Sequence, residues 1–307
     1  MRAIRRVAGS LVAAIGVCAA DGAAQAVPSL GAEALIGTAG VTALSPWGTP
    51  GVAGNPATTG CCARWSLGLV LLNAPSTDVT ERSFAGAVRT GRVGIGLRLA
   101  TREVVDLFDD PVLEDADLRV EDTDASVTAA VALGRGVRIG ATGLYSNSTV
   151  LGATAEGFGG RLGAEYTGRD WSVGASYGSI QTGATWRIGG EGPGEETRGV
   201  RRLAAAASFN PARFWSLLPR VTVEADRDTG DRSERWARAS LGWSLLDGQL
   251  QILGGRAGEI SGQPVPSTYE AAVGVRISGF FVYLGARSGE EPAPGNTYAI
   301  GALFQHQ

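Results

Sequence analysis

The chain has 307 residues, a formal net charge of -3, 46 glycines and 44% hydrophobic residues, with a mean hydropathy of +0.06. Its 27 basic residues are dispersed along the sequence, so it lacks the basic stripe that binds nucleic acid. Beyond the amino terminus, no stretch supplies about twenty consecutive apolar residues, the length that a transmembrane helix needs. A membrane location would therefore have to come from strands.

The first 26 residues have the pattern of a secretory signal peptide. Arg2, Arg5 and Arg6 give a positive start, residues 7–20 are apolar, and Ala24-Gln25-Ala26 is a cleavage site of the A-x-A type. We therefore expect an exported protein of a Gram-negative bacterium, with a mature chain that starts near Val27.

Residues 27–64 form a distinct segment that is rich in Gly, Ala, Pro and Thr. Its apolar and polar residues alternate too weakly for the segment to be a further lipid-facing strand. The two cysteines that remain after processing, Cys61 and Cys62, lie near its end. Neighbouring cysteines rarely bond to each other because a vicinal disulfide strains the peptide. A small buried pair is the simplest interpretation, and a vicinal disulfide or a metal contact is the alternative.

From Trp65 onward, about fourteen segments carry apolar residues at every second position, the period of a strand with two different faces. Short connections alternate with long ones along this region. The short ones are residues 90–91, 134–136, 168–170, 247–248 and 278–279, with the stretch 210–220 as a longer exception. The long ones are residues 73–81, 105–124, 147–156, 179–199, 228–233, 259–267 and 288–296. This parity predicts an all-β, antiparallel up-and-down barrel of about fourteen strands, residues 65–307, with the layout of an outer-membrane barrel.

The period-two pattern assigns a lipid face and a lumen face to each strand. Leu97, Val223 and Val275 fall on the apolar side of their strands. A charge that faces lipid at mid-depth costs about 2–4 kcal/mol, so the charged side chains are expected to point inward. The predicted lumen-lining residues are Arg98, Arg138, Arg161, Glu165, Glu224, Asp226, Arg238, Glu270 and Arg276.

Large aromatic residues near strand ends predict interfacial girdles, although a β-sandwich core also alternates in this way. They are Trp65, Phe84, Tyr145, Trp171, Tyr177, Phe209, Trp243, Tyr269 and Tyr298. The regular alternation of short and long connections weighs against a β-sandwich. The last strand, with Tyr298, Ile300, Ala302 and Phe304 in alternation, is similar to the signal that barrel-assembly machinery recognises, but three further residues follow Phe304.

Fourteen is an even number, so both ends of the barrel chain should face the periplasm. About eight strands make a barrel whose interior side chains just fill it, so a barrel of fourteen strands needs another filler. Residues 27–64 precede the first strand and are the candidate. We expect this segment to enter the lumen as a plug.

A family resemblance supports this expectation. Residues 37–44, Gly-Thr-Ala-Gly-Val-Thr-Ala-Leu, and residues 54–60, Gly-Asn-Pro-Ala-Thr-Thr-Gly, resemble the amino-terminal signature of FadL-like and PorV/PorQ-like outer-membrane proteins. Thr58-Thr59 departs from the Gly-Leu that this family prefers after Asn-Pro-Ala. The resemblance implies a plugged barrel of fourteen strands in which Asn55 and Pro56 hold a turn at the periplasmic mouth. An ordinary turn before a strand is the alternative.

The stretch 105–124 contains nine acidic residues and one arginine, Arg119. Clustered carboxylates suit hard cations such as Ca²⁺, but no Asp-x-Asp-x-Asp-Gly sequence of a twelve-residue calcium loop occurs. A solvated acidic loop is the favoured interpretation. We expect no metal site and no cofactor.

Catalysis is disfavoured because the usual hydrolytic chemistry of barrels needs a histidine base, and the only histidine is His306. Two functions remain: a plugged conduit for small, hydrophobic molecules in the manner of FadL-like transporters, and a PorV-like docking or shuttle component for secreted proteins. A general porin or a purely structural barrel is a further alternative. Expected partners are outer-membrane lipid and lipopolysaccharide, the barrel-assembly machinery, and a hydrophobic small molecule or a secreted protein.

Overall fold

A computed structural model describes thirteen separate parts of the chain. They are residues 54–59, 64–74, 79–104, 120–150, 153–181, 183–188, 195–197, 200–210, 218–228, 235–246, 249–259, 268–289 and 296–306. The expected signal peptide, most of residues 27–64 with Cys61 and Cys62, and the acidic residues 105–119 lie outside these parts. Among the described residues, no helix is both long and apolar enough to cross a membrane.

The described chain consists of one short 3-10 helix, η1 (Pro56–Thr58), followed by sixteen strands. The first seven strands are β1 (Trp65–Ala74), β2 (Val79–Thr90), β3 (Val93–Val104), β4 (Val120–Gly134), β5 (Val137–Val150), β6 (Ala153–Thr167) and β7 (Trp171–Gln181). Two short strands follow, β8 (Gly183–Ile188) and β9 (Glu195–Thr197). The remaining strands are β10 (Val200–Phe209), β11 (Arg220–Asp228), β12 (Arg235–Leu245), β13 (Leu250–Glu259), β14 (Thr268–Ile277), β15 (Phe280–Gly289) and β16 (Thr297–His306).

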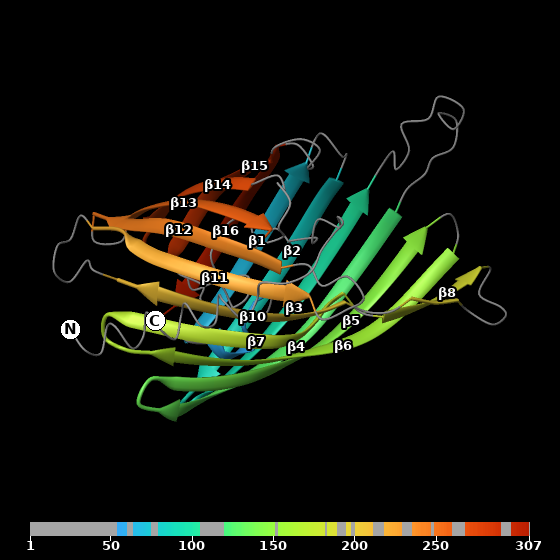
Figure 1. The fold of residues 1–307 in the computed structure, drawn as a ribbon, viewed down its shortest axis with the longest axis horizontal. Helices are drawn as coiled ribbons and strands as arrows, with labels where there is room; N and C mark the ends of the chain where they lie inside the picture. Colours follow the sequence, from blue (N-terminus) through green and yellow to red (C-terminus); the bar gives the residue numbers. More distant parts are fainter. Residues whose placement is uncertain are drawn as a thin grey trace.

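Fourteen of these strands form a closed antiparallel barrel, which confirms the predicted fold and strand number. The first and last strands pair with each other, with Trp65 opposite His306 and Leu71 opposite Ile300. The pairing of β5 with β6 completes the ring, so β1 to β7 and β10 to β16 make up the wall. Strands β8 and β9 form a hairpin that attaches to β6 outside this ring (Figure 1).

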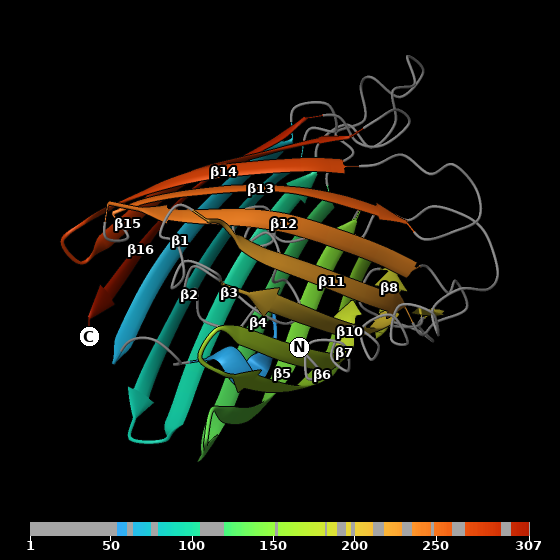
Figure 2. The ribbon, with the colours of Figure 1, turned by 60° about the vertical axis from the view of Figure 1, so that its left-hand side comes forward.

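Tight turns gather at one end of the barrel, where the C terminus also lies (Figure 2). We call this the short-turn end. Three long connections predicted for the other end are wrong in extent. The stretch 147–156 is almost entirely strand, because β5 continues to Val150 and β6 begins at Ala153. Similarly, β4 begins at Val120, so the last residues of the predicted acidic loop are strand residues, and β2 already includes Glu81.

The two faces of each strand differ as the alternation predicts. In β3, Leu97 and Leu99 are more than half exposed on the outside of the closed barrel, whereas Ala100 faces inward and is 5% exposed. The same pattern in β1 exposes Leu67, Leu69 and Leu71 and buries Val70 and Leu72. Because large apolar side chains are exposed on the outside of every part of the closed wall, this outside suits lipid, and outward arginines such as Arg82 and Arg201 lie toward the strand ends.

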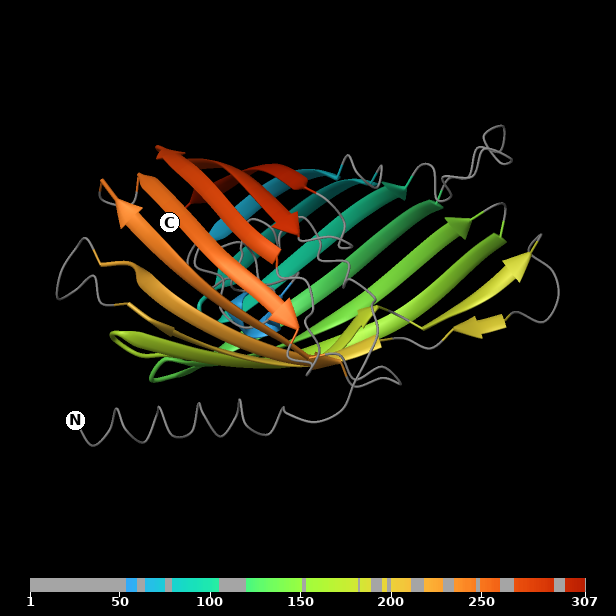
Figure 3. The ribbon, with the colours of Figure 1, turned by 45° about the horizontal axis from the view of Figure 1, so that its top comes forward.

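The seam between β6 and β7 is interrupted part of the way along the two strands. The lower part of β6, from Arg161 to Thr167, pairs with β7, but its upper part, from Ala153 to Phe158, pairs with β8 instead (Figure 3). Gly178 marks the change on β7: its φ is +151°, and a Cβ there would collide with the backbone of Gly160 and Arg161. Glycine is therefore required at the point where the two strands separate.

Candidate functional site

The inner face of the barrel is the candidate functional site, and much of it is polar. Small hydroxyl side chains line it and bond across neighbouring strands. Thr128 and Thr142 on β4 and β5 lie 2.7 Å apart through their hydroxyl oxygens, and Thr222 on β11 donates to Ser208 on β10 at 3.1 Å. Cross-strand pairs of this kind satisfy buried polar groups and hold the register of the wall.

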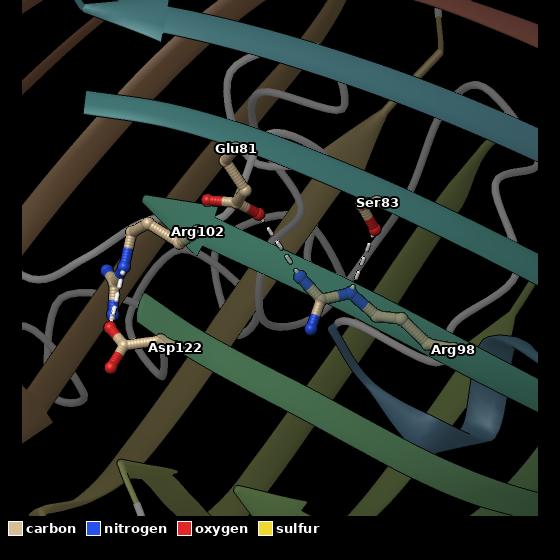
Figure 4. A network of polar contacts seen from close by, with 5 residues as sticks. All are labelled: Glu81, Ser83, Arg98, Arg102 and Asp122. Atoms are coloured by element: carbon tan, nitrogen blue, oxygen red, sulfur yellow. Dashed lines mark hydrogen bonds and ion pairs between the residues drawn. The ribbon is translucent and has the colours of Figure 1, made fainter. Parts of the chain in front are cut away.

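Charged residues on β2, β3 and β4 form a first network (Figure 4). Arg98 donates through Nε to Ser83 Oγ at 3.2 Å and lies 3.4 Å from Glu81 Oε1 through Nη2. Further along the same face of β3, near the end of the strand, Arg102 donates to Asp122 Oδ2 through Nη2 at 2.6 Å and through Nε at 3.1 Å. These pairs neutralise charges that the barrel wall would otherwise leave buried and uncompensated.

A second network connects four inward residues across five strands of the opposite side. Arg238 on β12 lies 3.9 Å from Glu224 on β11 and 3.4 Å from Glu270 on β14. To reach β14, Arg238 must pass over β13, where the inward residues Gly255 and Ala257 leave room. Arg287 on β15 completes the network with a contact of 2.6 Å to Glu270.

A third group lies near the short-turn end. Arg138 on β5 lies 3.1 Å from Glu165 Oε2 on β6 and donates to Thr167 Oγ1, whose hydroxyl donates to Glu165 Oε1 at 3.0 Å. At the same end, Arg276 on β14 is half-buried, with its guanidinium carbon 5.9 Å from the centre of the Phe281 ring. Of the predicted lumen residues, only the side chain of Asp226 lies outside the described part of the structure.

Sequence reasoning missed an apolar part of the inner face. Val70 and Leu72 on β1 and Leu303 on β16 point inward and are at most 6% exposed, together with Phe281 and Tyr283 on β15. With Leu253 on β13, these six residues form what we call the apolar wall. The Tyr283 ring lies directly over Gly301 of β16, where any larger residue would collide with it. The signal for this wall is a strand that is apolar on both faces, as in Phe280 to Leu284.

The lumen is therefore divided into two unlike sides. In the ring of fourteen strands, β15 lies seven strands from β6 in either direction, so Phe281 and Tyr283 face the side that carries Arg161. Polar inward residues that sequence reasoning also missed are Glu81, Arg202 and Arg287, and Arg235 is buried on the other face of its strand, opposite Arg227. Glu81 and Arg235 were assigned to or beside long loops, although both are strand residues.

Residues 54–59, which we call the N-terminal corner, are all buried and lie against the inner face of β4, β5 and β6 (Figure 2). Asn55 caps η1 by accepting a hydrogen bond from Ala57 N at 3.0 Å, and its amide nitrogen donates to Ala164 O of β6 at 2.9 Å. Pro56 follows at the first helical position, where its fixed φ suits the turn. The corner therefore has both internal bonds and a direct bond to the wall.

Arg161 joins the corner to the irregular seam. Its Nη1 donates to Gly54 O of the corner at 2.9 Å, and its Nη2 donates to Ser179 O of β7 at 3.1 Å. Ser179 follows Gly178, the residue at which β6 and β7 separate. One guanidinium thus holds the N-terminal corner and the free part of β7 together.

No group of three or more His, Cys, Asp or Glu side chains in the described parts is placed to hold a metal ion. The carboxylates of the lumen instead face arginines, as the three networks show. Cys61 and Cys62 lie outside the described residues, so the alternatives for that pair are unchanged.

The architecture defines the class: a closed antiparallel β-barrel of fourteen strands with the layout of outer-membrane barrels. No protein-family model matches the chain, and no curated protein matches it in sequence. Solved structures do match it in fold. The CymD monoaromatic hydrocarbon channel aligns with a TM-score of 0.64 at 12% identity, over 92% of this chain and 100% of that one.

Two further structures agree with this comparison. The Ralstonia pickettii toluene transporter TbuX has a TM-score of 0.62 at 13% identity, over 92% of this chain and all of that chain. A Pseudomonas aeruginosa FadL homologue has a TM-score of 0.60 at 9% identity, over 93% of this chain and all of that chain. The chain therefore has the fold of the FadL-like barrels, as the resemblance of residues 37–60 predicted. At these identities the likeness concerns the fold and does not extend to the ligand.

Proposed function

We propose that the protein is a plugged outer-membrane conduit for small hydrophobic molecules. The observation that carries this proposal is the apolar wall, because it places large apolar side chains inside a barrel whose outside is already apolar. A water-filled porin does not need such side chains on its inner face, and their presence favours a ligand that gains from apolar contact. Structural neighbours described as a monoaromatic hydrocarbon channel and a toluene transporter support the same ligand class.

The export route belongs to the same proposal. Residues 1–26 would direct the chain across the inner membrane, and the barrel would then insert with its short-turn end toward the periplasm. This orientation follows the general layout of such barrels, whose periplasmic connections are short and whose extracellular ones are longer. The partners expected at that stage are the barrel-assembly machinery and outer-membrane lipid, including lipopolysaccharide.

The plug is the second element of the proposal. The N-terminal corner contacts three adjacent strands and is bonded to β6 through Asn55 and Arg161. Because this corner is connected to residues 27–53, we infer that the segment 27–64 occupies part of the lumen and closes the resting barrel to ions. Deleting residues 31–54 should raise the single-channel conductance in planar bilayers while the barrel stays folded and heat-modifiable. Unchanged conductance would assign closure to another part of the chain.

Transport is tested by the initial uptake of radiolabelled toluene into cells of a Gram-negative host that carries the protein in its outer membrane. Uptake should exceed that of cells without the protein. Leu72→Asn and Leu253→Asn each place an amide in the apolar wall and should lower uptake several-fold, since an unpaired buried amide costs about 1–3 kcal/mol. Thr222→Asn, a similar change on the polar side of the lumen, is the matched control. No protein-dependent uptake, or equal uptake by all three variants, contradicts the proposal.

A general porin is the second candidate because three charged networks also line the lumen. Such a protein would conduct small ions without the deletion of residues 31–54 and would not distinguish toluene from polar solutes of equal size. The docking component for secreted proteins rests on the amino-terminal resemblance alone. The neighbours are described as channels and transporters, which agrees with a function without catalysis.

A further inference from the structure

Five exposed arginines follow one another along the rim of the short-turn end. Arg64 directly precedes β1, Arg89 and Arg92 flank the turn between β2 and β3, Arg135 lies in the turn between β4 and β5, and Arg169 lies in the turn between β6 and β7. We call these residues the basic arc. They occupy a continuous half of the rim, from β1 to β7, because these seven strands are neighbours in the wall.

Backbone contacts fix the spacing of the arc. Arg89 N donates to Arg64 O at 2.7 Å, so these two residues sit side by side on β1 and β2. Ala132 N donates to Arg92 O at 2.8 Å, which places Arg92 beside β4. Arg135 has a φ of +52° between two glycines, a tight left-handed turn that fixes its position at the tip. The arginines of the arc therefore lie at the ends of strands or in tight turns, and not in long loops.

Arg64 and Arg89 continue the inward register of Ser66 and Ala87, so they face the mouth of the lumen, whereas Arg92, Arg135 and Arg169 lie in the turns themselves. Val88 precedes Arg89, Val93 follows Arg92 and Leu133 lies two residues before Arg135, and all three apolar residues are between 45% and 56% exposed. Exposed Trp65 and Trp171 lie at the same level, Trp65 directly after Arg64 and Trp171 two residues after Arg169. Tryptophan rings at the ends of lipid-facing strands mark the boundary between hydrocarbon and headgroups. The turn residues Arg92, Arg135 and Arg169 thus lie at the level of the lipid phosphates.

The opposite end of the same strands has the opposite charge. Glu103, Glu121, Asp122 and Asp124 lie on β3 and β4 near the long connections, and Glu156 is exposed on β6. On the arc itself, the described carboxylates are Asp170 and the inward Glu165, which contacts Arg138. Arg82 and Arg102 also lie toward the end opposite the arc, but among the described residues of β1 to β6 carboxylates outnumber arginines there, whereas arginines outnumber carboxylates at the short-turn end.

We propose that the three turn residues of the basic arc, Arg92, Arg135 and Arg169, bind the headgroups of anionic phospholipids in the periplasmic leaflet. A guanidinium group matches a phosphate through two parallel hydrogen bonds, and several such groups along one arc favour an anionic over a zwitterionic headgroup. The inference depends on the proposed membrane location but not on the ligand of the lumen. It gives the protein a lipid-dependent stability and a fixed depth in one leaflet.

The experiment compares two triple variants of the full-length mature protein in vesicles of phosphatidylcholine, with and without phosphatidylglycerol. Arg92→Gln/Arg135→Gln/Arg169→Gln removes the three turn residues of the arc. Arg82→Gln/Arg201→Gln/Arg227→Gln removes the same charge from outward positions near the other end of the barrel. Native mass spectrometry of protein extracted with its bound lipid counts the phosphatidylglycerol molecules retained, and thermal unfolding measures their effect.

The unaltered protein should retain phosphatidylglycerol in preference to phosphatidylcholine, and the arc variant should lose about tenfold to a hundredfold of that preference. The control variant should keep it. Equal loss in both variants would mean that net charge, and not the arc, attracts the lipid, and equal retention would mean that the arc does not bind it. Either outcome overturns the inference while leaving the conduit proposal intact. Failure of the unaltered protein to insert into any vesicle would overturn both.

Discussion

Gly140 of β5 and Gly163 of β6 are direct register partners, and the N-terminal corner rests on both of them. A Cβ on Gly140 would come within 2.6 Å of Pro56, and a Cβ on Gly163 would collide with the side-chain oxygen of Asn55. The two glycines therefore form a shallow depression in the wall that matches the Asn-Pro turn. Glycine within a strand often marks such a close approach of another backbone.

Gly140→Ala and Gly163→Ala should each displace the corner without opening the barrel. Forcing a methyl group into this close contact costs about 1–3 kcal/mol, so the corner should leave its site before the strands separate. Limited proteolysis of the amino-terminal segment should accelerate in both variants. Gly143→Ala is the matched control because it lies on β5 with nothing within 4 Å of the added Cβ. Equal proteolysis in all three variants would contradict the contact.

Removing Arg238 should destabilise the barrel more than removing a surface ion pair. Its side chain is 8% exposed and faces both Glu224 and Glu270, so Arg238→Met leaves two buried carboxylates without this partner. Removing one partner of a buried ion pair lowers the stability of the fold by about 3–5 kcal/mol. The urea midpoint in vesicles should fall accordingly, and Glu224→Gln in the same chain should recover part of the loss. Arg102→Met, whose side chain is 30% exposed, should cost less.

Alternation predicted the closed barrel because a period of two is a property of each strand alone. Leu97 and Arg98 could be assigned to opposite faces without knowing which strands pair. The apolar wall escaped the same reasoning, because β1 and β15 are apolar on both faces and give no alternation in Leu67 to Leu72 or Phe280 to Leu284. A strand that faces lipid on one side and an apolar lumen on the other has no contrast to detect.

Two other features depend on contacts between distant residues. Asn55 and Ala164 are 109 positions apart, and the depression at Gly140 and Gly163 exists only after β5 and β6 have paired. The β8–β9 hairpin pairs with β6 in place of β7, a choice that local pattern does not encode. The sequence motif around Asn55 indicated a turn. Which wall residues contact this turn depends on the pairing register of β5 and β6.

Single cysteines should report the two faces directly when the native pair is replaced by Cys61→Ser/Cys62→Ser. Leu97→Cys and Val275→Cys lie on the outward face, where the native side chains are 57% and 45% exposed. A maleimide carried on a lipid chain should label both positions rapidly. Arg98→Cys, on the inward face of the same strand as Leu97, should remain unlabelled by that reagent. Labelling of Arg98→Cys with protection of Leu97→Cys would reverse the assignment of the faces.

Arg161 should couple the N-terminal corner to the seam between β6 and β7. Its guanidinium group donates to Gly54 O and Ser179 O, so Arg161→Met removes both bonds while keeping most of the side-chain volume. Asn55→Ala removes the cap of η1 and the bond to Ala164 but leaves Arg161 in contact with the wall. Loss of a helix cap costs about 0.5–2 kcal/mol, enough to loosen the corner in the Asn55→Ala variant.

Hydrogen exchange distinguishes the two substitutions. Both should raise exchange in residues 54–59, because each breaks bonds that hold the corner. Only Arg161→Met should also raise exchange in β7 beyond Gly178, since Ser179 loses its bond to the guanidinium there. Exchange at β12 to β14, remote from the corner, serves as the internal control. An equal rise at Ser179 in both variants would mean that the corner as a whole supports the seam, and no rise in either would remove Arg161 from this role.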